Sequence, residues 1–304
     1  MIIFVLEIYY HPLYSTGISE SSNFPRERYK LLYQALSVPQ YAEDIKFITP
    51  EKVKIDLLYQ VHQKTYVNNF LNGNLSKTEK RKIGLRPWTS DIVERTLLIT
   101  GGSIQALDSA INNGISGNLA GGTHHAHYSH GAGYCIFNDI AVCAFYCKNN
   151  YKNFQNILII DLDVHQGDGT ASLLKKENSV FTFSIHCESN FPLKKENSDI
   201  DISLKKGTND TDYLSVLYSN LKLLEKIEAD IVFFQAGVDS LEKDKLGHMK
   251  MTNDGMKKRN KMILDFSKKK SCPVLVFMGG GYSEPIDHTI EAFRTLFIQC
   301  SEYI

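Results

Sequence analysis

The chain has 304 residues, of which 43% are hydrophobic and 22% charged, as is ordinary for a globular protein with a large buried core. Lysine plus arginine equals aspartate plus glutamate at 34 each, so no overall field attracts nucleic acid or an anionic membrane. The six cysteines form no CxxC pair, which favours a reduced, cytoplasmic protein. No apolar run reaches the length of a membrane span, and the short apolar N-terminus is expected to be a strand rather than a signal peptide.

Strands and helices are expected to alternate along the chain. Short aliphatic runs bounded by turn signals predict strands at 2–8, 118–120, 157–160, 180–185, 230–236 and 273–278. Helical spacing of apolar residues predicts helices that begin near Pro25 and after Pro50, and further helices over 92–111, 138–147, 212–227, 252–268 and 286–297. The stretch 72–90 is expected to be a long surface loop, and the stretch from 186 to about 209 is expected to be irregular.

This alternation predicts an α/β fold with a central, mostly parallel sheet covered by helices on both faces. The sequence shows no linker, internal repeat or low-complexity segment. We therefore expect a single domain over residues 1–304.

The most informative stretch follows the predicted strand 157–160. The aliphatic run passes directly into Asp161, Asp163 and His165, and alternation along an extended segment places these three side chains on one side. Charged groups at the end of a buried strand must be paired or bound, because an isolated buried charge is costly. A divalent cation is the simplest partner.

Other predicted strands also lead into polar side chains. The carboxyl ends of parallel strands meet at one edge of a sheet, where ligands bind, so we expect these groups to face a common rim. They are His124 and His125 after strand 118–120, Asp168 further along the central stretch, His186 after strand 180–185, Asp239 after strand 230–236, and Gly279–Gly281 with Tyr282 after strand 273–278.

Isolated polar residues have simpler explanations. A single Asp after a strand is often a turn residue or helix cap, and for Asp239 alone the two explanations are equally good. A single His is usually a satisfied core or surface group, which is the interpretation we favour for His11, His62, His248 and His288. A glycine run can be merely a turn, although glycines also let the backbone approach a ligand closely.

The ligand types indicate the metal. Asp163, His165 and Asp239 would form an oxygen-rich site with one nitrogen, and no cysteine is placed to join them. Three protein ligands with an open position are typical of a catalytic zinc site, although ferrous iron accepts the same set. A water activated by such a cation is a nucleophile at neutral pH.

The remaining polar groups suit acid–base chemistry. His124 and His125 titrate near neutrality, and Asp161 and Asp168 are available to orient the two imidazoles. Tyr282 offers a hydroxyl to a developing oxyanion, as hydrolysis of an acyl bond requires.

Five segments carry a family resemblance: Gly121–Ala126, Gly133–Cys135 with Asn138 and Asp139, Asp161–Thr170, Gln235–Asp239 and Gly279–Tyr282. As a set, in this order, these segments resemble the histone deacetylase family within the arginase–deacetylase superfamily, most closely its class IV-like and bacterial branch. The resemblance extends from about residue 8 to 298.

The resemblance implies a role for each catalytic group. Zinc would be bound by Asp163, His165 and Asp239. His125, held by Asp168, would be the general base, while His124, paired with Asp161, would give electrostatic support and a proton for the leaving amine. Tyr282 would polarise the scissile carbonyl together with the metal.

The resemblance also implies a substrate tunnel and a second ion. Gly133, Tyr134 and Phe191 would line a narrow tunnel for an acylated lysine chain, and Gly280 is a further substrate-binding candidate. The family often has Phe where this chain has Tyr134. A structural potassium ion would be held mainly by backbone oxygens, from Asp161, Asp163, His165, Ser184 and Ile185.

The expected activity is removal of acetyl or longer acyl groups from the lysine side chains of proteins. An arginase-like two-metal site is disfavoured, because Asp239 is followed by Ser240 and Leu241 rather than by a second carboxylate pair. Deacetylation of acetylpolyamines or other small acylated amines stays open, because Glu188, Glu196 and Asp199 lie in a plausible rim loop. A catalytically silent acyl-lysine binding module is the more remote alternative. The oligomeric state stays open, and no direct nucleic-acid partner is expected.

Overall fold

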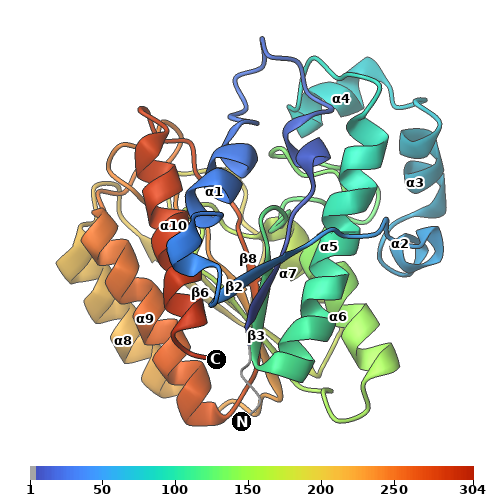
Figure 1. The fold of residues 1–304 in the computed structure, drawn as a ribbon. Helices are drawn as coiled ribbons and strands as arrows, with labels where there is room; N and C mark the ends of the chain where they lie inside the picture. The colour runs from blue at the N-terminus through green and yellow to red at the C-terminus, as the bar shows by residue number, and fades with distance from the viewer. Residues whose placement is uncertain (1–4) are drawn as a thin grey trace.

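A central sheet of eight strands runs through the computed structural model, which describes residues 5–304 (Figure 1). Every pairing within this sheet is parallel, and the strand order is β2-β1-β3-β8-β7-β4-β5-β6. Residues 2–4 of the predicted first strand lie outside the described residues. The strands are β1 (Leu6–Tyr9), β2 (Ile45–Ile48), β3 (Ile115–Asn118), β4 (Ile157–Asp161), β5 (Val180–Cys187), β6 (Ile200–Leu204), β7 (Ile231–Gln235) and β8 (Val274–Phe277).

Helices cover both faces of this sheet (Figure 1). On one face α10 packs against α1 and α9, and α9 packs against α8. On the other face α6 packs against α5, α2 and α7. The helices are α1 (Arg28–Leu36), α2 (Ile55–Val61), α3 (Lys64–Leu71), α4 (Lys77–Ile83), α5 (Ile92–Asn113), α6 (Asp139–Asn150), α7 (Asp168–Leu174), α8 (Asp210–Leu224), α9 (Asn253–Lys270) and α10 (Asp287–Ser301), with 3₁₀ turns at Pro12–Ser15 and Pro39–Tyr41. The predicted α/β fold with a parallel sheet between helices is therefore confirmed.

The strand order explains where a site can form. The chain passes from β3 to β4, which are not neighbours, and the later strands β7 and β8 fill the gap between them. In parallel sheets ligands bind beyond the carboxyl ends of the strands, at such changes of direction. The four central strands β3, β8, β7 and β4 therefore deliver their following loops to one place.

The stretch 72–90 is not a continuous surface loop, as the sequence had predicted, because it contains helix α4. Ser76 accepts a hydrogen bond from the backbone N–H of Glu79, whose side chain accepts one from the backbone N–H of Ser76. This capping box satisfies two N–H groups that a helix start leaves free. α4 has only one buried residue, Ile83, so its sequence carries almost no apolar periodicity.

Three further expectations about the elements were wrong. The stretch after 186 is not wholly irregular, since it contains the edge strand β6, in which no residue is buried. The helix expected after Pro50 is two helices, α2 and α3, separated at His62. The strand expected at 118–120 lies earlier, at Ile115–Asn118, where Ser116 and Gly117 replace the usual branched apolar residues.

Helix α5 approaches a neighbouring segment at a glycine. A Cβ atom on Gly101 would lie 1.9 Å from the backbone oxygen of Glu51 and 2.8 Å from the backbone nitrogen of Val53. Real Cβ atoms do not come this close to backbone atoms, so only glycine allows this packing.

We expect Gly101→Ala to destabilise the protein by about 1–3 kcal/mol, as overpacking does. The higher helix propensity of alanine would favour the variant by about 1 kcal/mol, and the clash should outweigh it. Urea unfolding measures the change. Asn112→Ala, at an exposed position of the same helix, is the control and should stay within about 0.5 kcal/mol of the parent. An unchanged midpoint for Gly101→Ala would contradict the close approach.

Candidate active site

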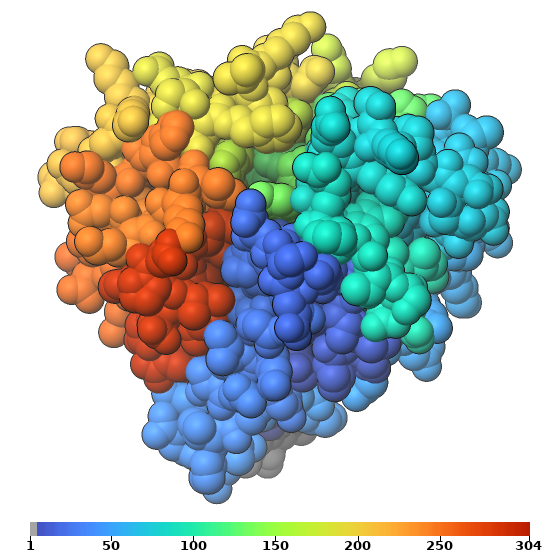
Figure 2. Space-filling view, turned by 90° about the horizontal axis from the view of Figure 1, so that it is seen from above, coloured from blue at the N-terminus to red at the C-terminus, as the bar shows by residue number. Residues whose placement is uncertain are grey.

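A pocket opens at the carboxyl ends of the four central strands. Figure 2 looks down on this edge and shows a hollow with green chain at its floor, bordered by the blue, teal, yellow and orange segments. The segments after β3, β4 and β8, together with α1 and α5, supply the pocket walls. The lining includes Arg28, Arg95, His124, His125, Gly133, Tyr134, Asp163, His165, Gly280 and Tyr282.

Three side chains converge as a candidate metal-binding set at the ends of β4 and β7. Asp163, His165 and Asp239 each offer one ligand atom, and these atoms all lie within 4.8 Å of one another. His165 Nδ1 lies 3.1 Å from Asp163 Oδ1 and 3.0 Å from Asp239 Oδ2. All three residues are buried. Asp239 is 74 positions after His165 in the sequence, and it reaches the other two residues because β4 and β7 are neighbouring strands.

Backbone N–H groups bind the carboxylate oxygens of Asp163 and Asp239 that do not contact His165. The backbone N–H of Gly280 donates to Asp163 Oδ2 at 2.8 Å, and that of Val164 donates to Asp239 Oδ1 at 2.9 Å. A Cβ on Gly280 would lie 1.9 Å from Asp239 Oδ2. A side chain at position 280 would therefore displace the Asp239 carboxylate, so Gly280 forms the wall of the site.

The electrostatics of this set fit a bound cation. Burial and the adjacent Asp163 carboxylate raise the pKa of Asp239 to about 7. Burial alone would lower the pKa of His165, but hydrogen bonds with Asp163 and Asp239 raise it to about 10. The two buried carboxylates thus draw a proton onto His165, and a divalent cation held by both carboxylates and the neutral imidazole would balance the same negative charge.

The tandem histidines each have their own carboxylate. His124 Nδ1 lies 2.8 Å from Asp161 Oδ2, and His125 Nδ1 lies 2.6 Å from Asp168 Oδ1. Burial would lower the pKa of His124, but the charges of Asp161 and Asp163 raise it to about 9. Burial and the neighbouring His124 charge lower the pKa of His125 to about 4. Two adjacent imidazoles are thereby given opposite protonation preferences.

A buried aspartate shapes the loop that carries these histidines. Asp139, in the first turn of α6, accepts hydrogen bonds from the backbone N–H groups of Gly122 and Thr123 and from the Ser103 hydroxyl. The preceding Asn138 caps the helix by accepting from the N–H of Ala141. The start of α6 therefore fixes the path of the β3–α6 loop.

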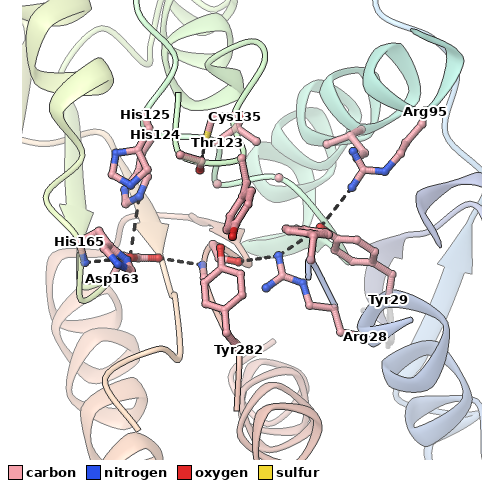
Figure 3. A pocket seen from close by; sticks show the side chains of 18 residues that line it. Arg28, Tyr29, Arg95, Thr123, His124, His125, Cys135, Asp163, His165 and Tyr282 are labelled. Atoms are coloured by element: carbon pink, nitrogen blue, oxygen red, sulfur yellow. Dashed lines mark hydrogen bonds and ion pairs between the residues drawn. The ribbon is translucent and has the colours of Figure 1, made fainter. Parts of the chain in front are cut away.

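Tyr282 lies beside the metal-binding set, with its backbone held from two sides. Asp244 accepts a hydrogen bond from the Tyr282 N–H at 2.6 Å. The buried Arg28 donates to the backbone oxygens of Gly279 and Gly281, and its guanidinium lies 5.5 Å from the centre of the Tyr282 ring. Figure 3 shows Tyr282 between Asp163 and His165 on one side and Arg28 on the other.

Of the predicted tunnel residues, Gly133 and Tyr134 line the pocket and Phe191 packs against His125. Gly133, at φ +51°, lies so close to the His125 ring that a Cβ would come within 2.5 Å of it. The Phe191 ring is 4.8 Å from the His125 ring, measured between centres, and Phe191 is 43% exposed. Tyr134 packs edge-on against Phe24 and is 5.7 Å from Tyr282, again between ring centres. Aromatic rings therefore flank the way in.

One expected rim residue is elsewhere. His186 does not join the site, because it lies inside β5, fully buried, with its ring nitrogens 2.9 Å from Ser184 Oγ and 3.1 Å from Ser203 Oγ. The Ser184 hydroxyl thus already has a protein partner. Asp161 and Ser184 are register partners on neighbouring strands, which is compatible with the potassium site, and that site stays a prediction.

Several buried residues that support the site were not predicted from the sequence. Gln235 Nε2 donates to Asp163 Oδ2, and the Asn190 side-chain nitrogen lies 3.3 Å from His165 Nε2. Arg259, fully buried on α9, donates to the backbone oxygens of Leu162, Ala236 and Gly237. Gln235 was visible only as a motif position, and no periodic signal marks the others.

A buried two-carboxylate, one-imidazole set beside two imidazole–carboxylate pairs is an arrangement typical of metal-dependent hydrolases, here on an α/β scaffold. The sequence profile of the histone deacetylase domain matches residues 22–296. The chain therefore belongs to the histone deacetylase family, as its sequence motifs had indicated.

The chain is also similar to individual proteins over most of its length. An uncharacterised protein of Picosynechococcus is 40% identical over 92% of this chain and 93% of its own length. Histone deacetylase 2 of Arabidopsis thaliana is 28% identical over 88% of this chain and 71% of its own. A crystal structure of a histone deacetylase homologue from Aquifex aeolicus superimposes with a TM-score of 0.82 at 23% identity, over 98% of this chain and 84% of that one. No helix within residues 5–304 is both long and apolar enough to cross a membrane.

We expect Asp163→Asn to purify with little bound metal, because a neutral amide is a poorer donor than a carboxylate at a site that needs charge neutralisation. Elemental analysis of the purified protein measures this. Asp168→Asn is the matched control, since Asp168 is also buried and bonded to an imidazole but lies outside the donor set. Equal metal content in both variants would mean that the ligand assignment is wrong.

Proposed function

We propose that the protein is a zinc-dependent hydrolase that removes acetyl or longer acyl groups from lysine side chains of proteins. The observation that carries this proposal is that one pocket is lined by two carboxylate-backed imidazoles, by Tyr282 and by two members of the buried Asp–His–Asp donor set. Membership of the histone deacetylase family supports the same chemistry.

Asp163, His165 and Asp239 would hold the metal. When bound, a divalent cation supplies a Lewis acid that polarises the scissile carbonyl and makes a nearby water more acidic. Two carboxylates and one imidazole suit zinc, and ferrous iron is the alternative. A structural potassium ion near β4 and β5 is part of the proposal.

The two histidines would divide the proton transfers. His125 directs Nδ1–H to the ionised Asp168, which leaves the Nε2 lone pair free to accept a proton from the attacking water. As the water oxygen bonds to the acyl carbon, the carbonyl oxygen gains charge, and Tyr282 would donate its hydroxyl to it. A histidine then returns a proton to the amine as the carbon–nitrogen bond breaks, and the positive charge that Asp161 favours on His124 would stabilise the anionic centre.

The inner end of the pocket suits the acid product. Hydrolysis of an acyl-lysine releases a carboxylate. Arg28 and Arg95 line the pocket beyond Tyr282, on the side away from His165 (Figure 3). Both guanidinium groups are buried and bond to backbone oxygens and the Tyr29 hydroxyl rather than to a carboxylate, so their charge is available to a carboxylate product.

The mouth favours a polypeptide over a polycation. Leu193 is 96% exposed next to the half-exposed Phe191, which offers an apolar contact. Lys195 Nζ donates to the backbone oxygens of Asn190 and Pro192, and thus brings positive charge to this loop. Asp199, a candidate acidic rim residue, instead accepts from the backbone and hydroxyl of Thr182 within β5.

We also propose a cytoplasmic location, which the six buried free cysteines support. The proposed partner is an acylated lysine in a protein or peptide, without direct binding of nucleic acid. An acetylpolyamine or another small acylated amine is the alternative substrate.

We expect Tyr282→Phe to lower kcat by about 10²- to 10³-fold, as loss of one oxyanion donor does, with unchanged metal content and melting temperature. Rates on an acetyl-lysine peptide measure this effect. Tyr128→Phe removes an equivalent hydroxyl from an exposed ring and should leave kcat unaltered. A near-parental rate for Tyr282→Phe would exclude the oxyanion role.

We expect kcat/KM on acyl-lysine peptides to exceed that on acetylpolyamines by at least about 10-fold, which corresponds to about 1.4 kcal/mol of transition-state stabilisation. The physical reason is repulsion between a polycation and the lysine-bearing mouth. A rate comparison over acetyl-lysine peptides, long-chain acyl-lysine peptides and acetylpolyamines, at known zinc content, measures it. Faster hydrolysis of the polyamine would replace the proposed substrate class by the alternative one.

A further inference from the structure

The carboxylate behind His125 is shared with a third histidine. Asp168 Oδ1 lies 2.6 Å from His125 Nδ1, and Asp168 Oδ2 lies 3.1 Å from His127 Nε2. The carboxylate behind His124 is arranged differently, because Asp161 Oδ1 accepts instead from the backbone N–H of Asp163 at 3.1 Å. Asp161 and Asp168 each bind one imidazole of the tandem histidines, but the second oxygen of Asp161 binds a backbone N–H and that of Asp168 binds a histidine ring.

The direction of the new hydrogen bond follows from charge. Burial would raise the pKa of Asp168, but the hydrogen bonds from His125 and His127 outweigh burial and keep this pKa below its usual range. An ionised carboxylate only accepts hydrogen bonds. Both imidazoles must therefore donate, His125 through Nδ1–H and His127 through Nε2–H.

His127 is held in place independently of this contact. Its backbone oxygen accepts from Nδ1 of the buried His62 at 2.9 Å, and its backbone N–H donates to the oxygen of His130. The His62 orientation is fixed at its other end, because His62 Nε2 accepts from the Asn138 N–H. The His127 ring stacks on His130 at 4.8 Å between centres and 17° between planes.

This arrangement places His127 on the solvent side of the dyad. The side chain of His127 is 17% exposed, whereas that of His125 is 5% exposed. His127 reaches no atom of the metal-binding set in the hydrogen bonds of residues 5–304. Its link to the proposed catalytic groups is the hydrogen bond to Asp168.

We propose that His127 is a positioning residue: by donating Nε2–H to Asp168 Oδ2, it fixes the orientation in which Asp168 Oδ1 receives the His125 Nδ1–H. A carboxylate held at one oxygen only is free to turn about its terminal bond, which would misalign His125. Because kcat depends on a proton acceptor at the correct position and substrate binding does not, the effect falls on kcat. The kinetic part of this inference rests on the proposed function.

The test compares His127→Phe, which keeps the ring stack but has no donor, with His127→Gln, whose side-chain amide can still donate to Asp168. In His127→Phe we expect kcat on an acetyl-lysine peptide to fall about 10-fold, with KM within twofold and with unchanged metal content and melting temperature. His127→Gln should recover kcat to within about threefold of the parent. His130→Gln, which alters the stack without touching Asp168, should be unaffected.

A second measurement does not depend on activity. In metal-free protein, the imidazole nitrogen and proton NMR signals report whether His125 Nδ1–H is hydrogen-bonded to Asp168 and whether His127 carries its proton on Nε2. We expect the low-field His125 Nδ1–H signal to weaken in His127→Phe and to persist in His127→Gln.

The outcomes separate the two proposals. An unchanged kcat in His127→Phe with an unchanged NMR signal overturns the positioning role. Equal losses of kcat in the Phe and Gln variants, together with a lowered melting temperature, also overturn it in favour of a purely structural role. If the parent protein hydrolyses no acylated amine, the proposed function fails, and the NMR comparison alone then supports or overturns the contact.

Discussion

The constraint on which the site depends is the burial of two carboxylates, Asp163 and Asp239, side by side at the end of a parallel sheet. Neither carboxylate has more than about 1% of its surface exposed, and like charges this close are strongly unfavourable in a water-poor interior. Hydrogen bonds from neighbouring groups reduce this cost. Backbone N–H groups of Val164 and Gly280 satisfy the second oxygens, and His165 lies between the two carboxylates. The remaining imbalance is what a divalent cation would remove.

Buried arginines complement this acidic centre from behind. Arg259 binds three backbone oxygens of the turns after β4 and β7, and Arg28 binds two of the turn after β8. Each guanidinium satisfies carbonyls that the strands leave unpaired at their ends, and each keeps a positive charge near the carboxylates. These turns carry Asp163, Asp239 and Tyr282. The arginines thus fix the backbone geometry of the site, and they do so from helices at opposite ends of the sequence.

The residues that could be predicted from the sequence share a physical basis. Asp163 and His165 alternate directly after a buried strand, and the parallel sheet brings Asp239 to the same edge. The unpredicted parts lack such signals. Helix α4 buries only Ile83, so no apolar period marks it, although its Ser76–Glu79 capping box was visible in the sequence. Edge strand β6 buries no residue. A buried arginine that binds backbone oxygens, such as Arg259, has no motif, because its partners can be any residue type.

The tandem histidines His124 and His125 are adjacent in the sequence, but their imidazoles have opposite pKa shifts. Asp161, which is bonded to His124, accepts a hydrogen bond from the backbone N–H of Asp163, and His124 itself lies near the Asp163 carboxylate. His124 therefore belongs electrostatically to the acidic centre, which favours its charged form. Asp168, behind His125, begins helix α7 and receives a second hydrogen bond from His127. His125 is buried beside the charge of His124, and these two effects lower its pKa more than Asp168 raises it. The two chemically identical imidazoles thus differ in protonation preference because their surroundings differ.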